Sequence, residues 1–335
     1  MILPSQQIAA LIEAGHVDSG PALTSGLPPT LQPASLDLRL GSTAYRMRAS
    51  FLPGSSARVA DGVDALCLHE VDLDAGAVLE TGCIYLVPLM ERLALPDGVS
   101  ALANPKSSTG RLDVFARVIG EGSDRFDALP DGYSGPLWLE VAPRTFPVLA
   151  RTGDRLSQIR FREGDARPLR RQTVSVDLSG SAEVVGYRAR RHSGLVDLRG
   201  VGAHAALDYW EPVRLMDGGL ILEPEEFYIL ASREAVEIPV DEAAEMAPID
   251  TEIGEFRAHY AGFFDPGFGV ADAGGAGSRA VLEVRGRDVP FLLRHGQPVA
   301  HLVFEALTAV PDAVYGSRGS SYQSQGLRLG KHFAT

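Results

Sequence analysis

The chain has 335 residues, which is enough for two domains of ordinary size. Its 31 basic and 43 acidic residues give a formal net charge of −12, which argues against broad binding to nucleic acid or to an anionic membrane. The apolar runs are too short to span a bilayer, and residues 1–15 lack the basic region and cleavage site of a signal peptide. Because Cys67 and Cys83 are the only cysteines, we expect no disulfide framework and predict a cytoplasmic protein with reduced thiols.

The sequence lacks the motifs of common metalloenzymes. Zinc-dependent nucleobase deaminases hold their metal with an H-x-E helix and a P-C-x-x-C helix, and neither motif occurs in this chain. The H-E-x-x-H pattern of zinc proteases is also missing. We therefore expect no zinc and no other catalytic transition metal.

The first predicted elements are a short helix and a strand. Residues 5–14 have the apolar spacing of an amphipathic helix, with Ser5 as its cap. Residues 32–41, "QPASLDLRLG", alternate Asp37 and Arg39 with leucines, which predicts one strand and gives both charged residues a structural role. We expect little helix in the rest of the chain.

The segment "NPKSSTGRLDV", residues 104–114, gathers cationic and hydroxyl side chains. Lys106, Ser107, Ser108 and Arg111 are residues that suit the oxygens of a phosphate group. The segment is not a Walker A loop, because no G-x-x-x-x-G-K-[ST] run is present. The alternative interpretation is a solvated β-turn with incidental charge.

The chain also repeats itself, which is a strong guide to its architecture. At one constant offset of 143 residues, three segments of the first half match three of the second: 83–99 with 226–242, 138–141 with 281–284, and 152–161 with 295–304. Short alternating apolar segments between Gly, Pro and Asp turns predict strands in both copies. We predict an all-β fold of tandem duplicated β-barrel or jelly-roll domains, residues 1–170 and 180–335, with few short helices.

The two copies differ in their polar motifs. The basic turn of the first copy falls on Asp250, Thr251 and Glu252 of the second. The second copy instead carries "YAGFFDPGFG" and a Gly/Ser-rich tail, "YGSRGSSYQSQG", that ends at residue 326. This division predicts a composite site between the copies, either within one chain or between chains.

Five motifs resemble, in chain order, those of dCTP deaminases, which belong to the trimeric dUTPase-like superfamily. They are "QPASLDLRLG" (32–41), "KSSTGR" (106–111), "AGFFDPGF" (261–268), "VLEV" (281–284) and "YQSQG" (322–326). The resemblance spans most of the chain, and the split of the motifs over a tandem repeat looks like the two-domain bacterial form of that family. It implies two dUTPase-like barrels, in which the lysine-serine turn of one copy meets the Asp-Pro-Gly turn and the glutamate of the other.

The resemblance further implies hydrolytic deamination of dCTP to dUTP and ammonia, in the synthesis of pyrimidine deoxynucleotides. Without zinc, a carboxylate has to act as general base and proton shuttle at C4 of cytosine. The resemblance gives this role to Glu283 of "VLEV", while Glu140 of "WLEV" occupies the equivalent place in the first copy and is the rival. Ser107 and Arg111 are implied to lie near the catalytic water.

The nucleotide-binding residues that the resemblance implies come from both copies. They are Lys106, Ser107, Ser108, Arg111, Asp265, Val281, Leu282, Tyr315, Tyr322 and Gln325. Asp265 is expected to accept from the deoxyribose 3′-hydroxyl or to shape its turn. Because Ser321 stands where the family has a lysine, triphosphate binding is expected to draw on Arg318 or on another chain. Mg²⁺ is expected to come with the triphosphate and not from a protein cage.

Two other functions remain open at this point. A dUTP diphosphatase, or a bifunctional enzyme that continues to dUMP, is the first alternative. A non-catalytic regulator that binds dCTP or dTTP on the same barrel is the second. We expect self-association, with a trimer as the leading hypothesis, because two repeats do not close a threefold ring. The expected partners are nucleotides and copies of the chain, with no nucleic acid and no membrane.

Overall fold

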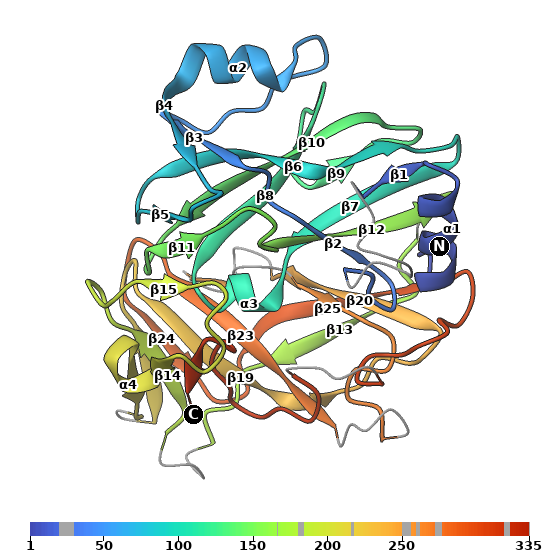
Figure 1. Ribbon diagram of the computed structural model, residues 1–335. Helices are drawn as coiled ribbons and strands as arrows, with labels where there is room; N and C mark the ends of the chain where they lie inside the picture. The colour runs from blue at the N-terminus through green and yellow to red at the C-terminus, as the bar shows by residue number, and fades with distance from the viewer. Residues whose placement is uncertain are drawn as a thin grey trace.

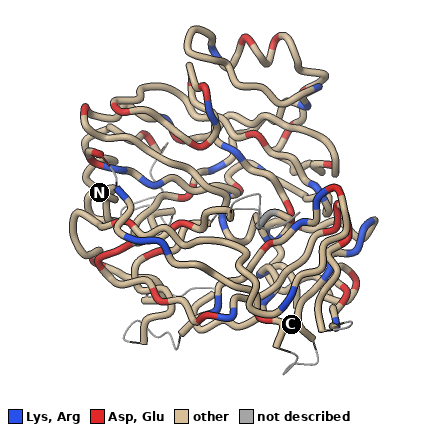
Figure 2. Tube along the Cα trace, turned by 180° about the vertical axis from the view of Figure 1, so that it is seen from behind, with Lys and Arg blue, Asp and Glu red and all other residues tan. Residues whose placement is uncertain are grey.

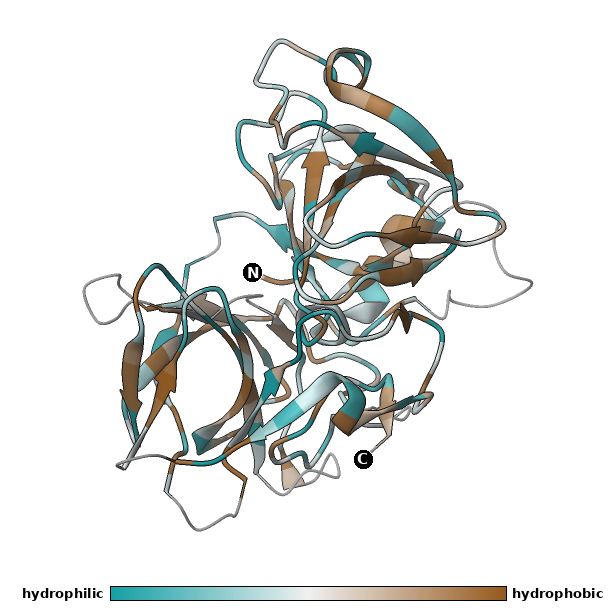
Figure 3. Ribbon diagram, turned by 90° about the vertical axis from the view of Figure 1, so that its left-hand side faces the viewer, coloured by the Kyte–Doolittle hydropathy of each residue, from teal (hydrophilic) through white to brown (hydrophobic). Residues whose placement is uncertain are grey.

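Two sets of strands, one from each half of the chain, form two barrel-like units that pack against each other (Figures 1 and 3). The computed structural model describes residues 1–19, 30–165, 167–179, 184–215, 218–249, 256–258, 262–271, 277–317 and 322–334. In these residues strands predominate and the helices are few and short, so the prediction of an all-β fold is confirmed.

The described elements of the first half are α1 (Ser5–Glu13), β1 (Val17–Asp18), β2 (Leu36–Leu38), β3 (Thr43–Met47), α2 (Val59–Leu66), β4 (Cys67–Asp72), β5 (Ala77–Leu79), β6 (Ile84–Ala94), β7 (Val99–Pro105), α3 (Ser107–Gly110), β8 (Val114–Gly120), β9 (Ala128–Leu129), β10 (Ser134–Pro143), β11 (Val148–Ala150) and β12 (Ser157–Glu163). Those of the second half are β13 (Arg170–Ser175), β14 (Gly186–Ala189), β15 (Val196–Asp197), β16 (His204–Ala205), α4 (Ala206–Tyr209), β17 (Trp210–Val213), β18 (Gly219–Leu222), β19 (Phe227–Val236), β20 (Glu242–Pro248), β21 (Phe256–Ala258), β22 (Phe263–Phe264), β23 (Ser278–Gly286), β24 (Phe291–Arg294), β25 (Pro298–Ala306) and β26 (Phe333–Ala334).

The strands repeat as the sequence predicts. The first residues of β3 and β14, of β4 and β17, of β7 and β20, and of β11 and β24 are each 143 residues apart. The pairing repeats as well, because β10 lies between β6 and β8 while β23 lies between β19 and β21. The duplicated architecture is therefore present in both sequence and structure.

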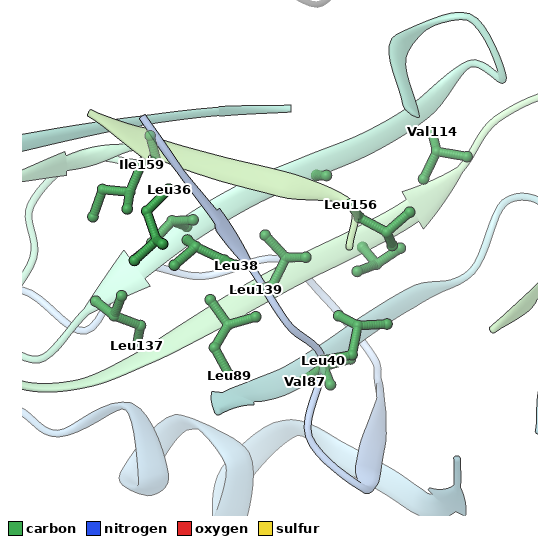
Figure 4. Close-up of a cluster of buried hydrophobic side chains, with 14 of the residues drawn as sticks. Leu36, Leu38, Leu40, Val87, Leu89, Val114, Leu137, Leu139, Leu156 and Ile159 are labelled. Carbon is green, nitrogen blue, oxygen red and sulfur yellow. The ribbon is translucent and has the colours of Figure 1, made fainter. Parts of the chain in front are cut away.

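Each unit has its own apolar core. In the first, Leu36, Leu38 and Leu40 pack against apolar side chains of β10, including Leu137 and Leu139 (Figure 4). All five of these leucines are at most 1% exposed. Alternation of apolar and polar residues directs these side chains to the inside of the barrel, and the second unit has a separate core of the same kind.

Two local predictions were wrong. Ser5 does not cap α1; Pro4 stands at the cap position without a side-chain bond, because the Ser5 backbone N–H instead donates to the carbonyl of Pro33 (2.8 Å). The strand predicted at residues 32–41 is only three residues long, although its leucines are in the core as expected.

Charge and membrane length add little to the fold. Lys and Arg are interspersed with Asp and Glu along the trace (Figure 2). Among the described residues, no helix is both long and apolar enough to cross a bilayer.

Short segments cross between the two halves. Ile2 bridges to Leu307 of the second half and to Arg162 of the first. Strand β15 leaves the second half and pairs in parallel with β11. These crossings tie the two units together at several points, so the halves of the sequence are not independent bodies.

A buried ion pair also joins the units. Asp113 follows α3 with a left-handed backbone (φ 56°) and is fully buried, and its carboxylate accepts from Arg285 of β23 and from the Thr145 hydroxyl (2.5 Å). Arg285 is only 7% exposed and also donates to the carbonyl of Glu225. The pair fixes β23 against the end of the basic turn.

We expect Asp113→Ala to lower the free energy of unfolding by about 3–5 kcal/mol, because it leaves the Arg285 guanidinium buried without its carboxylate. Denaturant unfolding followed by fluorescence measures this loss. Asp124→Ala is the matched control, since the Asp124 side chain is 81% exposed, and its effect is expected to stay within about 0.5 kcal/mol. Equal stability of the two variants would contradict the role given to this ion pair.

Candidate active site

A cavity of about 510 Å³ lies between the two units. Its lining residues come from α1, β2, α3 and β12 of the first half, and from β20, β22, β23 and the C-terminal segment of the second. We call it the interdomain cavity. Much of its wall is apolar: Leu31, Pro33, Met246, Phe263, Phe264, Phe268, Val281, Tyr315 and Tyr322. Apolar walls with a few convergent polar groups are typical of small-molecule sites.

The basic turn lies on this cavity as the short helix α3. The backbone N–H of Lys106 donates to the carbonyl of Leu156 (3.0 Å), and the Thr109 hydroxyl donates to the same carbonyl (2.7 Å). These two bonds hold the turn against the start of β12. Ser107 and Ser108 both line the cavity as a result, which is the arrangement that phosphate binding requires.

Asp37 is a cavity residue that the sequence interpretation missed. It is 1% exposed and accepts from the ammonium of Lys106 and from Arg155 (3.2 Å). Leu36 and Leu38 enter the core on either side of it, so the strand alternation turns Asp37 toward the cavity. Its role is therefore to hold two cavity cations in place, and an acidic residue between two core leucines was the signal in the sequence.

Arg111 joins the basic turn to the C-terminal tail. It is 3% exposed and donates to the side-chain oxygen of Gln325 (2.9 Å) and to the carbonyl of Arg328 (3.0 Å). Its guanidinium also stacks on the ring of Tyr322, 3.9 Å from the ring centroid. The structure thus brings Arg111, Tyr322 and Gln325 together, and the tail is folded onto the turn.

Glu283 projects from β23 into the same cavity. It is 6% exposed, and its Oε1 lies 3.9 Å from Nε of Arg111. Burial raises the pKa of Glu283 to about 8, with Arg111 acting in the opposite direction and Asp113 adding to the rise. A carboxyl with a pKa near neutrality can both take up and return a proton, which is what general acid–base catalysis requires.

Glu140, the equivalent residue of the first copy, lines neither described cavity. Its carboxylate accepts from Arg117, which lies directly opposite on β8. Arg117 in turn stacks on Phe126, 3.8 Å from the ring centroid. The glutamate of the first copy is therefore part of a structural ion pair, whereas that of the second copy faces the cavity.

The Asp-Pro-Gly turn closes another side of the cavity. Asp265 is 8% exposed and accepts from Arg160 of β12 (3.3 Å). Burial raises the pKa of Asp265, and Arg160 opposes the rise. Gly267 has φ 90°, a left-handed conformation that favours glycine. The turn thus depends on a buried cation of the other unit.

The tail is fastened to this turn as well. The Gln323 side chain donates to the carbonyl of Gly267 (3.2 Å) and accepts from the N–H of Gly269 (3.1 Å). Tyr315 packs on Phe268 with ring centroids 5.5 Å apart. Tyr315 therefore lines the cavity, as the sequence predicts for a ligand-binding residue.

The remaining predicted residues have different positions. Val281 lines the interdomain cavity, but the side chain of Leu282 is fully buried in the core of the second unit, because successive residues of β23 point to opposite faces. A side-chain contact of Leu282 with a ligand is thus excluded by this placement. Arg318 and Ser321, and the Asp250–Glu252 segment, lie outside the described residues.

Lysine placement was also missed. The chain has 29 arginines but only two lysines, Lys106 and Lys331, and both line the interdomain cavity. The scarcity of lysine was a signal available in the sequence. Within the described residues, no cluster of three or more His, Cys, Asp or Glu side chains could hold a metal ion.

Tandem all-β units with a cavity between them, walled by a serine-rich basic turn and a buried glutamate, define a dUTPase-like protein with a site for a small phosphorylated ligand. The family model described as "2'-deoxycytidine 5'-triphosphate deaminase (DCD) N-terminal domain" matches residues 1–165, and the corresponding C-terminal domain model matches residues 169–333. The chain belongs to the dCTP deaminase family.

Known proteins support the same assignment. A crystal structure of 2'-deoxycytidine 5'-triphosphate deaminase from Agrobacterium tumefaciens is 52% identical, with a TM-score of 0.85 over 91% of this chain and 98% of that one. A dCTP deaminase of Haloarcula marismortui is 30% identical over 49% of this chain and 80% of its own length. A "dCTP deaminase, dUMP-forming" of a Nocardioides species is 30% identical over 48% of this chain and 79% of its own length.

Proposed function

We propose that the protein hydrolyses dCTP to dUTP and ammonia in the interdomain cavity, with Glu283 as general base. The observation that carries the proposal is the position of this glutamate, buried in the cavity wall and 3.9 Å from Arg111. The family supplies the substrate class, and the serine turn with the two lysines supplies groups for its phosphates.

The chemistry follows from the protonation of Glu283. The carboxylate takes a proton from a water molecule as its oxygen attacks C4 of cytosine, and the resulting acid protonates N3. The remaining hydroxyl proton then passes through Glu283 to the exocyclic amino group, the C4–N bond breaks, and ammonia leaves a C4 carbonyl. The 3.9 Å gap between Glu283 and Arg111 is too long for a direct hydrogen bond and fits one bridging water.

Arg111 supports this cycle in two ways. Its Nε is buried and makes no hydrogen bond in the described part of the chain, so it is available to a water or to the ligand. Its positive charge also lowers the pKa of Glu283, which favours the ionised base.

Mg²⁺ would bind with the triphosphate. The described carboxylates of the cavity fit this view, because Asp37 and Asp265 are paired with cations and Glu283 faces Arg111. When bound, the ion would neutralise phosphate charge, and the phosphates themselves would be its main ligands. We also keep a cytoplasmic trimer as our proposal for location and assembly.

A second product is favoured by specific relatives. Two proteins named "dCTP deaminase, dUMP-forming", from Nocardioides and from Methanoculleus marisnigri, are 30% and 31% identical to this chain. The second candidate function is therefore a bifunctional enzyme that also cleaves dUTP to dUMP and pyrophosphate.

Incubation of the purified protein with dCTP and Mg²⁺, with nucleotides resolved by chromatography and ammonia assayed, tests the proposal. We expect dUTP and ammonia in equal amounts. Accumulation of dUMP and pyrophosphate would replace it with the bifunctional assignment. Binding of dCTP or dTTP without any turnover would overturn it in favour of a regulator.

A further inference from the structure

A second cavity, of about 350 Å³, adjoins the interdomain cavity. The two share four lining residues: Lys106, Ser108, Arg155 and Lys331. The second cavity also reaches Arg199, which follows β15, and His332, next to the C-terminal strand β26. We call it the basic cavity, since its described lining holds four Lys or Arg residues and one carboxylate, Asp154.

The charges of the basic cavity are held in place but not neutralised. Arg199 donates to Asp154 (2.6 Å) and to the carbonyl of Thr152 (2.8 Å), so its guanidinium is fixed at the cavity. The Lys331 ammonium makes no hydrogen bond or ion pair with any described residue. Lys106 and Arg155 lower the pKa of Lys331 in addition to the effect of burial. Like charges that converge in this way gain most from a bound anion.

A buried polar atom points to the same conclusion. His332 is 2% exposed and lines the basic cavity, and its Nδ1 has no hydrogen-bond partner in the described part of the chain. Buried polar atoms in proteins are almost always paired. An unpaired imidazole nitrogen beside three cations therefore marks a place for a polar ligand.

We propose that the basic cavity binds a phosphoryl group, next to the one that the serine turn holds in the interdomain cavity. The site is built by Arg199, Lys331 and His332, from a segment that follows β15 and from the C-terminal end. Lysine ammonium and arginine guanidinium groups are the side chains that bind phosphate oxygens in proteins. Both lysines of the chain face this place, although arginine outnumbers lysine elsewhere.

Two sources can supply the phosphoryl group. One is the terminal phosphate of a nucleotide whose base lies in the interdomain cavity, and this source rests on the proposed function. The other is a free anion, such as pyrophosphate. The shared lining residues allow one polyphosphate chain to extend from the first cavity into the second.

The first test compares Arg199→Gln with wild type, because Arg199 lines the basic cavity only. Calorimetric titrations with dCMP, dCTP and pyrophosphate measure affinity. If a nucleotide supplies the phosphate, Arg199→Gln weakens dCTP binding about tenfold and leaves dCMP binding unchanged. If a free anion is the ligand, the variant weakens pyrophosphate binding and treats dCTP and dCMP alike. Arg125→Gln, whose side chain is 75% exposed, is the control.

The second test uses the scarcity of lysine. An amine-reactive acylating reagent can modify only Met1, Lys106 and Lys331, and mass spectrometry resolves the three. We expect dCTP or pyrophosphate to slow modification of Lys331 severalfold, with the exposed Met1 amine as internal reference. The proposal is overturned if Arg199→Gln matches the control with all three ligands, or if none of them protects Lys331.

These outcomes are separable from the fate of the proposed function. If wild type does not deaminate dCTP but Arg199→Gln loses affinity for dCTP or pyrophosphate, the anion site stands and the deaminase assignment falls. If deamination proceeds and the affinities are unchanged, the reverse holds.

Discussion

Glu283→Gln is expected to lower kcat for dCTP deamination by about 10²- to 10⁴-fold, because the amide cannot take the proton from water or pass it to N3. The change is nearly isosteric, so nucleotide binding should persist. Steady-state kinetics with dCTP and a binding titration of the same protein measure both quantities. Loss of binding together with loss of turnover would instead point to a structural role.

The repeat provides the matched control for this experiment. Glu140→Gln makes the same change at the equivalent position of the first copy, where the carboxylate is paired with Arg117 and faces no described cavity. We expect its kcat to remain close to that of wild type. An inactive Glu140→Gln beside an active Glu283→Gln would reverse the assignment of the base.

The pH dependence of wild type follows from the same residue. The ionised form of Glu283 is the active base, and its pKa is raised to about 8. The value of kcat/KM is therefore expected to rise about tenfold per pH unit below pH 8 and to level off above it. A flat profile between pH 6 and pH 9 would show that this titration does not limit the reaction.

Arg111→Gln is expected to cost about 10²-fold or more in kcat/KM and to shift the rising limb of the pH profile to higher pH. Two effects combine: the C-terminal tail loses its bonds to the guanidinium, and the pKa of Glu283 rises further without the nearby cation. Arg111→Lys keeps the charge without the planar fork, so it should restore more of the pH profile than of the rate.

Arg117→Gln serves as the control for Arg111. It removes the arginine that pairs with the glutamate of the first copy, away from the described cavities. A pH profile identical to wild type is expected. If Arg111→Gln also left the profile in place, the coupling between Arg111 and Glu283 would be refuted.

The sequence predicts the repeated strands well but the site only in part. The offset of 143 residues is a local pattern, and the same alternation of apolar side chains gives matching strands such as β7 and β20. Glu283 and the serine turn are found through motifs. These features depend on short stretches of sequence.

The missed residues depend on tertiary packing. Lys331 reaches the cavity only because residues 322–329 fold back onto Arg111, more than 200 positions away in the chain. Asp37 becomes a cavity residue because its strand is short and both neighbours enter the core. No local pattern encodes such long-range approaches, and the side chain of Leu282 was assigned to the ligand although alternation within β23 turns it into the core.

The division of the interdomain cavity between two halves of one chain has a consequence for concentration. The basic turn and the glutamate strand are covalently joined, so their encounter is intramolecular and its effective concentration does not change on dilution. A site shared by separate chains would come apart as the protein is diluted below its association constant. Here, dilution leaves the described walls of the cavity together, and each polypeptide carries one such site instead of two.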